Sequence, residues 1–129
     1  QVSDVVSLHA PLTPENKGMI DARALKSMKP TSILINAARG GIINEVDLYS
    51  ALKSRVIAGA GIDVFEEEPP SESPLLELDN VVLSPHTAAF TFEGMNNMSV
   101  GVVEQLIAYY HGNKPVHTVN PEAWDAQKV

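Results

Sequence analysis

The chain has 129 residues, 44% of them hydrophobic and 19% charged, which fits one globular domain with its own core and disfavours a disordered or fibrous protein. Its formal net charge of −7 argues against a nucleic-acid surface, because binding phosphate backbones needs clustered Lys and Arg. With no cysteine, no basic leader and no run of about 20 apolar residues, we expect a soluble cytoplasmic protein without disulfides or a membrane partner.

The first predicted elements are two strands and a short helix. Residues 4–11 (DVVSLHAP) form a β-rich run that ends in proline, and their near-continuous apolar character predicts a strand covered on both faces. After a polar turn, Asp21 is placed to cap a helix over residues 22–28, which Pro30 ends. Residues 32–36 (SILIN) then predict a second buried strand.

The next segment predicts a helix, two strands and a loop. Asn44 can cap a helix over residues 45–54. The predicted buried face of this helix comprises Val46, Ala51 and Leu52. Residues 56–65 (VIAGAGIDVF) predict a third strand, in which the run of Gly and Ala indicates close approach of a helix or a ligand. Residues 66–74 (EEEPPSESP) predict a loop, and residues 80–86 (NVVLSPH) predict a fourth short strand.

The longest helix is expected to begin after Thr91. Apolar residues recur at helical spacing as far as Tyr110, and Gly112 is placed to terminate the helix. We interpret Tyr109, Tyr110 and the methionines of this helix most simply as core packing. The tail over residues 113–129 is interrupted by proline and is expected to be extended.

Strands that alternate with helices of about ten residues predict right-handed βαβ units, and therefore a doubly wound α/β fold with a parallel sheet. In such sheets ligands bind beyond the carboxyl ends of the strands. The polar residues that follow the predicted strands are therefore the candidate site: His9, Arg39, Asp63, the run Glu66–Glu68, and His86.

These residue types suit the chemistry of a small acid. Arg39 offers a fork of donors that can hold a carboxylate, and the two glycines after it allow a ligand to approach closely. His86 can exchange a proton near neutral pH, and Glu68 is a suitable partner to orient it. Together they could anchor a carboxylate and move a proton at a neighbouring oxygen, as interconversion of a hydroxyl and a carbonyl requires, with the hydride supplied by a cofactor.

Each of these residues also has a plain structural interpretation. A lone arginine at a strand end is more often a surface ion-pair partner, and an EEE run beside two prolines is ordinarily a solvated loop. His9 could equally cap a strand or contact a nucleotide. A metal site built from His and Glu is disfavoured, because the sequence has no close ligand pair such as HxxxH.

Four segments in unbroken order carry a family resemblance: SDVVSLHAPLTPENKGMI, MKPTSILINAARGGIINEVDLYSAL, IAGAGIDVFEEEP and LDNVVLSPHTA. Together, over roughly residues 3–112, they resemble the D-isomer-specific 2-hydroxyacid dehydrogenases, a family of NAD-dependent enzymes. The resemblance implies an oxidoreductase that interconverts a 2-oxo acid and a D-2-hydroxy acid with NAD, and NADP stays open as the cofactor. The amino-acid sequences of the motifs are most similar to those of the phosphoglycerate and glyoxylate/hydroxypyruvate members.

The resemblance also implies a role for each candidate residue. Arg39 would grip the carboxylate and carbonyl of the substrate, His86 would be the acid/base, and Glu68 would pair with this histidine. Asp63 corresponds to an aspartate that contacts the nicotinamide end, and Ala88 stands where many members have a glycine beside the nicotinamide. The segments that would line the dinucleotide contain His9, Pro11, Ala37 and Ala38.

A further implication is that the chain is a piece of a longer enzyme. The family's GxGxxG turn, its ribose-binding acid and its N-terminal substrate domain are absent from the sequence. Residues 1–90 would be the C-terminal portion of the NAD-binding domain, about strands three to six of a partial Rossmann-like sheet. Residues 91–129 would be a returning helix and tail that pack on the substrate domain. In a 3-2-1-4-5-6 sheet without strands one and two, the first strand here would be separated from the second.

Three functions therefore stay open. The chain can come from an enzyme that acts on a small acid as a homodimer, from a non-catalytic relative that senses NAD and binds a protein, or it can be a partial fold that binds neither cofactor nor substrate. The presence of all three catalytic residue types favours the enzyme over the sensor. The missing segments favour the inactive partial fold for the isolated chain.

Overall fold

The structure is a computed structural model and describes residues 2–126. The chain divides between Ala88 and Ala89 into two compact units, the N-terminal unit (residues 2–88) and the C-terminal unit (residues 89–126), which are described separately below. None of the helices in residues 2–126 combines the length and the apolar character that crossing a bilayer requires.

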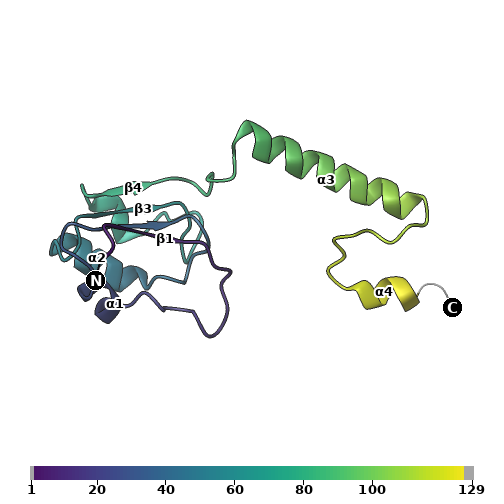
Figure 1. Ribbon diagram of the computed structural model, residues 1–129. Helices are drawn as coiled ribbons and strands as arrows, with labels where there is room; N and C mark the ends of the chain where they lie inside the picture. Colours follow the sequence, from purple (N-terminus) through teal and green to yellow (C-terminus); the bar gives the residue numbers. More distant parts are fainter. Residues whose placement is uncertain (1, 127–129) are drawn as a thin grey trace. The chain divides into compact units, whose positions relative to one another are not determined.

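A four-stranded parallel sheet forms the centre of the N-terminal unit (Figure 1). Its strands, in the spatial order β1-β2-β3-β4, are β1 (Val5–Leu8), β2 (Ile33–Asn36), β3 (Gly59–Ile62) and β4 (Val81–Leu83). The connecting helices are α1 (Ala22–Lys26), α2 (Glu45–Lys53) and the 3-10 helix η1 (Pro74–Glu77). The predicted α/β fold with parallel βαβ units is confirmed.

Both predicted N-caps of this unit are confirmed. Asp21 Oδ1 accepts the Ala24 N–H at 2.8 Å, and Asn44 Oδ1 accepts the Asp47 N–H at 3.1 Å. A capping side chain satisfies one of the N–H groups that a helix start leaves without an intrahelical partner. The starts of α1 and α2 are therefore fixed by local sequence.

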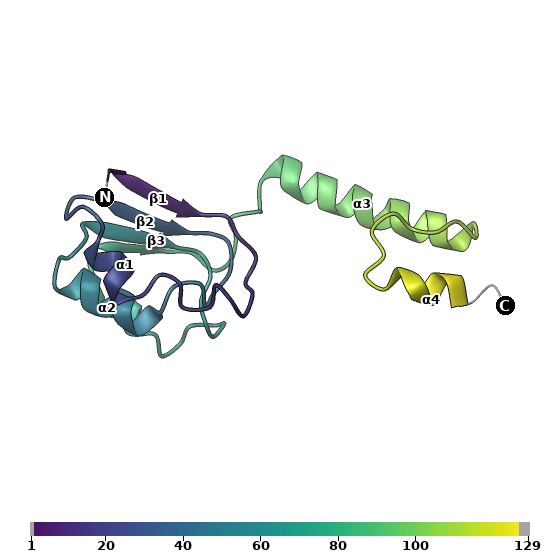
Figure 2. The ribbon, with the colours of Figure 1, turned by 60° about the horizontal axis from the view of Figure 1, so that its bottom comes forward.

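The core lies between the sheet and the two helices α1 and α2, which cover the same face of it (Figure 2). Its most deeply buried apolar side chains, none more than 1% exposed, are Leu25, Leu34, Ile42, Leu48, Leu52, Ile57 and Leu75. The prediction that Val46 lies on the buried face of α2 is wrong, because this side chain is 70% exposed. Residues i, i+3 and i+4 share a helix face, so Leu48 rather than Val46 lies with Ala51 and Leu52.

The other face of the sheet is open within residues 2–88. Val5 and Ser7 of β1 and Val82 of β4 are exposed, so the prediction of cover on both faces is wrong for this unit. Successive side chains of a strand point to opposite faces. Because right-handed crossovers that advance in one direction along a sheet place their helices on one face, α1 and α2 bury only every second strand residue.

The sheet has no gap. β1 pairs with β2 in parallel register, with Val5 opposite Ile33 and Leu8 opposite Asn36. The prediction that the first strand is separated from the second is therefore wrong. The third and fourth strands are not neighbours in a 3-2-1-4-5-6 order, so β1 does not hold the position of the third strand. The spatial order of the four strands is instead the same as their order along the chain. This is the arrangement on one side of the point where a doubly wound sheet reverses its strand order.

The C-terminal unit contains two helices, α3 (Phe92–Tyr110) and α4 (Pro121–Ala126). The predicted ends of α3 are confirmed: Thr91 Oγ1 accepts the Gly94 N–H at 2.9 Å, and Gly112 has a φ of +73° beyond the last turn. The tail was expected to be extended, and α4 corrects this for residues 121–126, whereas residues 127–129 lie outside the described chain.

The interpretation of the apolar residues of α3 as core packing is wrong for the described chain. None of the α3 residues is buried, and Tyr110 is 82% exposed. Tyr109 makes an edge-on contact with Trp124, with ring centroids 5.9 Å apart, and remains half exposed. Apolar spacing identifies a helix face, but burial of that face requires an opposing surface.

Candidate active site

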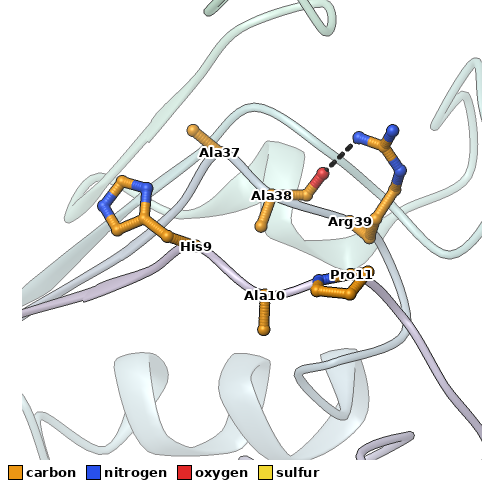
Figure 3. Close-up of a pocket in the computed structure, with 6 residues that line it drawn as sticks. All are labelled: His9, Ala10, Pro11, Ala37, Ala38 and Arg39. Atoms are coloured by element: carbon orange, nitrogen blue, oxygen red, sulfur yellow. Dashed lines mark hydrogen bonds between the residues drawn. The ribbon is translucent and has the colours of Figure 1, made fainter. Parts of the chain in front are cut away.

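A hollow of about 320 Å³ lies at the carboxyl ends of β1 and β2 (Figure 3). Its lining residues come from the turns after these two strands, and they are His9, Ala10, Pro11, Ala37, Ala38 and Arg39. Four of the six have small or cyclic side chains, which leave the backbone accessible. The side chains of His9 and Arg39 extend from opposite ends of the group, and His9 Nε2 lies 2.8 Å from Ser7 Oγ. The hollow is at the low end of the size range of small-molecule pockets.

Asn36 organises the turn that presents Arg39. This side chain is 2% exposed, and its Oδ1 accepts the Ala38 N–H at 3.1 Å while its Nδ2 donates to the Arg39 carbonyl at 3.0 Å. Arg39 Nη1 donates to the Ala38 carbonyl at 2.7 Å, its one side-chain hydrogen bond to the described residues. A guanidinium has five donors, so most of them remain for a ligand. Sequence reasoning did not assign a role to Asn36; an amide at the end of a buried strand was the available signal.

Glu68 and His86 form a hydrogen-bonded pair beyond β3 and β4. His86 Nδ1 lies 2.9 Å from Glu68 Oε2, and Glu68 Oε1 accepts the Phe65 N–H at 3.1 Å. The bond from His86, followed by the bond from Phe65, lowers the pKa of Glu68, so this side chain is a carboxylate at neutral pH. A carboxylate can only accept, hence Nδ1 carries the shared proton, and Nε2 is left without a part in this bond.

The loop that carries His86 is held by Asp63. This carboxylate is 5% exposed; its Oδ1 accepts Ser84 Oγ–H at 2.6 Å and the Thr87 N–H at 2.8 Å, and its Oδ2 accepts the Ala88 N–H at 2.9 Å. Burial alone would raise the pKa of Asp63, but these hydrogen bonds outweigh it and lower the pKa below its ordinary value. His86 itself has a φ of +54°, and its N–H donates to the Asp63 carbonyl at 2.9 Å.

The turn that carries Arg39 and the turn that carries Glu68 are in backbone contact. A Cβ placed on Gly40 would lie 1.8 Å from the Phe65 carbonyl oxygen, so only glycine allows this approach. No direct bond joins the side chains of Arg39 and His86 among the described residues. Among the same residues, no three His, Asp or Glu side chains come together in a way that could hold a metal ion.

Comparison with known proteins decides the family. Residues 1–88 match the sequence profile described as "D-isomer specific 2-hydroxyacid dehydrogenase, NAD binding domain". The chain belongs to this family. The resemblance noted from the four motifs is thereby confirmed.

Individual relatives of this chain are glyoxylate reductases and D-3-phosphoglycerate dehydrogenases. It is 50% identical over 121 residues to a glyoxylate reductase of Korarchaeum cryptofilum, a match that covers 93% of this chain and 36% of the relative. It is 43% identical over 118 residues to a D-3-phosphoglycerate dehydrogenase of Methanocaldococcus jannaschii, covering 92% of this chain and 22% of the relative. The chain thus spans about a third or less of the length of these relatives.

The fold of the chain matches solved structures of the family. A D-isomer specific 2-hydroxyacid dehydrogenase of Lactobacillus delbrueckii ssp. bulgaricus, in an NAD complexed form, aligns with a TM-score of 0.82 at 34% identity. This match covers 91% of the present chain and 40% of the other. An NADPH-dependent glyoxylate/hydroxypyruvate reductase of Sinorhizobium meliloti, in complex with NADP and malonate, aligns with a TM-score of 0.76 at 38% identity, covering 83% and 34% of the two chains.

The structure of the chain thus groups the candidate residues into three sets. His9, Pro11, Ala37, Ala38 and Arg39 line one hollow; Glu68 and His86 form one pair; and Asp63 binds the Ala88 N–H. Glu66 and Glu67 take no part in the pair. The roles of these residues toward substrate and cofactor remain predictions.

Proposed function

We propose that this chain is part of an oxidoreductase that interconverts a 2-oxo acid and a D-2-hydroxy acid, with NAD or NADP as the cofactor. The single observation that carries the proposal is the Glu68–His86 pair, at 2.9 Å, beside a strand-end turn that presents an arginine. The family membership and the names of the relatives, glyoxylate reductase among them, support the same reaction class.

In the proposed reaction His86 moves the proton. Glu68 accepts a hydrogen bond from His86 Nδ1–H and thereby fixes the ring, so that Nε2 can donate its proton to the carbonyl oxygen of the 2-oxo acid during reduction, or accept the hydroxyl proton during oxidation. His86 is half exposed, at 51%, as a group that must reach a substrate requires. His86 has a left-handed backbone conformation, and Asp63 holds the loop that carries it. The fixed backbone limits how far the imidazole ring can move away from Glu68.

Arg39 is the proposed anchor for the substrate. Its guanidinium can hold the carboxylate of a small acid with two parallel hydrogen bonds, and the Asn36 amide keeps the turn in place while it does so. Contact of the Gly40 backbone with Phe65 brings this turn against the segment that leads to Glu68. Arg39 would hold the carboxylate of the acid, and His86 would protonate the oxygen on the adjacent carbon.

The hollow after β1 and β2 fits one end of a dinucleotide rather than the whole molecule. Its volume of about 320 Å³ and its small lining residues suit a flat ring or a ribose against the backbone of residues 9–11 and 37–39. We propose that His9, Pro11, Ala37 and Ala38 line this cofactor region, with Asp63 and Ala88 on the side toward His86. A bound nicotinamide cofactor supplies the hydride.

The proposal includes the setting of the enzyme. We infer that the full-length gene product is a cytoplasmic homodimer that acts on free small acids, without nucleic acid or membrane as partners. The net charge of −7 supports the lack of a nucleic-acid partner, and a sequence without cysteine is compatible with a reducing compartment. Sedimentation of the purified gene product tests the dimer.

Turnover of glyoxylate by the full-length gene product, followed through NADH and NADPH absorbance, tests the reaction. Replacement of His86 by Ala should lower kcat by about 100- to 10,000-fold, which is the usual contribution of a general acid. His111→Ala, an exposed histidine in the C-terminal unit, is the matched control and should leave kcat unchanged. Turnover that survives His86→Ala refutes the assigned chemistry, and cofactor binding without turnover of any 2-oxo acid supports the sensor instead.

A further inference from the structure

Glu45, the first residue of α2, makes a hydrogen bond that the proposed chemistry does not use. Its Oε1 accepts the Glu66 N–H at 2.5 Å, and a longer bond of 3.4 Å runs back from the Glu45 N–H to Glu66 Oε1. These bonds join two segments that are 21 residues apart along the chain. The first follows Arg39, and the second leads to Glu68.

Glu45 is half-buried, and its partner Glu66 is exposed. Burial raises the pKa of Glu45, repulsion from the Glu66 carboxylate acts in the same direction, and the bond from the Glu66 N–H opposes both. A hydrogen bond from a backbone N–H to a carboxylate is stronger than one between neutral groups. The contact therefore has both the position and the strength to hold the second segment in place.

The segment Phe65–Glu68 is held by contacts with Gly40, Glu45 and His86, by burial of the Phe65 side chain, and by a hydrogen bond within the segment. The Phe65 side chain is buried, at 5% exposed, and its carbonyl packs against Gly40. Glu45 holds the Glu66 N–H, Glu68 Oε1 accepts the Phe65 N–H, and Glu68 Oε2 holds His86 Nδ1. A shift of the Phe65–Glu66 backbone would consequently move the carboxylate that orients His86.

We propose that Glu45 is a positioning residue, whose carboxylate holds the Phe65–Glu68 segment against the turn of Arg39 and so keeps Glu68 where it orients His86. That this orientation serves catalysis rests on the proposed function, but the coupling from Glu45 to His86 does not. Within residues 2–126 no hydrogen bond joins Glu45 to Glu68 or His86, so the proposed effect passes through the backbone of Glu66 and Phe65.

Two substitutions separate this role from the ordinary effect of an acid at a helix start. Glu45→Gln keeps the length of the side chain and an oxygen that can accept the Glu66 N–H, but it removes the negative charge. Glu45→Asp keeps the charge, which interacts favourably with the N-terminal end of a helix, but it withdraws the carboxylate by one methylene. Both variants should fold, because an acid in the first turn adds only a small contribution. Glu67→Gln, an exposed acid on the same segment, is the matched control.

The measurements use the full-length gene product and no turnover. Hydrogen exchange of the Glu66 amide should be about tenfold faster or more in Glu45→Asp, which corresponds to the loss of one charge-assisted hydrogen bond. In the same variant the pKa of the Glu68 carboxyl, followed by carbon-13 NMR, should rise toward its ordinary value, and the nitrogen-15 signals of the His86 ring should shift. Glu67→Gln should leave all three readings near wild type, and Glu45→Gln, which keeps a neutral and therefore weaker hydrogen bond, should change them less than Glu45→Asp does.

A change in Glu45→Gln as large as or larger than that in Glu45→Asp would show a helix-charge effect and overturn the proposal. Faster exchange at Glu66 without any change at Glu68 or His86 would also overturn it, because the coupling would end at the backbone. Since none of these readings depends on glyoxylate or a cofactor, their failure leaves the proposed reaction intact. Loss of the proposed reaction likewise leaves this coupling testable.

Discussion

The two units of the chain use the same kind of apolar pattern with opposite results. In the N-terminal unit Leu34 and Leu52 are fully buried between the sheet and two helices, whereas in the C-terminal unit Leu106 of α3 is 52% exposed. The first unit supplies its own opposing layer, and the second does not do so for α3. Helical periodicity therefore specifies a face, and the amount of stabilisation depends on what covers it.

The largest difference between the units should come from truncating a core leucine. Replacing Leu34 by Ala in the middle of β2 should lower the free energy of unfolding by about 2–5 kcal/mol, since it removes buried methylenes and leaves a cavity. The matched change Leu106→Ala in α3 should cost no more than about 0.5 kcal/mol. Urea unfolding followed by circular dichroism checks both. Equal losses would mean that α3 is packed as tightly as the sheet.

The glycines provide a second contrast of opposite sign. Gly40→Ala should destabilise by about 1–3 kcal/mol or more, because its Cβ would lie 1.8 Å from the rigid Phe65 carbonyl and the backbone would have to shift. A Cβ on Gly101 in α3 would have no atom within 4 Å. Gly101→Ala should therefore raise the free energy of unfolding by about 0.5–1 kcal/mol, because alanine has the better helix propensity. Thermal unfolding measures both changes. A neutral Gly40→Ala would contradict the backbone contact between the two turns.

Asp63 offers a third test, confined to the N-terminal unit. In Asp63→Asn an amide replaces the carboxylate that accepts bonds from Ser84, Thr87 and Ala88, so an NH₂ group faces one or more of these donors. The substitution should lower the free energy of unfolding by about 1–3 kcal/mol at neutral pH. The control Asp79→Asn alters an exposed ion pair with Arg55 and should change stability by no more than about 0.5 kcal/mol. Chemical unfolding of the two variants compares them directly.

The lowered pKa values of Asp63 and Glu68 determine how the stability of the fold changes with pH. The folded pKa values of Asp63 and Glu68 are lowered, so their stabilisation is fully present above the ordinary carboxyl pKa of about 4. It is lost as the pH falls through the lower folded values. Asp63→Asn should therefore unfold with a weaker dependence on pH below about 4, and an unchanged acid transition would contradict the hydrogen-bonded carboxylate.

The smallest contrast concerns the helix caps. Thr91→Ala and Asn44→Ala each remove one capping oxygen and should each cost about 1 kcal/mol. In α2 the loss should appear as lower overall stability without fraying, because Leu48 and Leu52 hold the helix to the sheet. In α3, which has no buried residue, it should appear as faster amide exchange in the first turn. Fraying of α2 rather than α3 would reverse the comparison.

The sequence identified all four strands, but three of them end three residues earlier than predicted, at Leu8, Ile62 and Leu83, and most bonds made by the residues after them were not predicted. His86 and Glu68 were expected to pair, and they lie at 2.9 Å. Asn36 was not assigned a role, although its amide holds the turn of Arg39 at both ends. The bonds from Asp63 to residues 84, 87 and 88 were likewise not foreseen, since they span 21 to 25 residues of sequence. Bonds of this range depend on where parallel strands finish, which local patterns do not contain.

By itself the sequence determined what is local: the caps at Asp21, Asn44 and Thr91, the helix stop at Gly112, and the family, through four ordered motifs. These features depend on residues within one or two turns of each other or on their order along the chain. The tertiary structure decided which apolar faces are buried, that β1 lies directly beside β2, and which donors reach each carboxylate. Such features arise only when distant segments pack, because burial and long-range hydrogen bonds need a second surface that the local sequence does not supply.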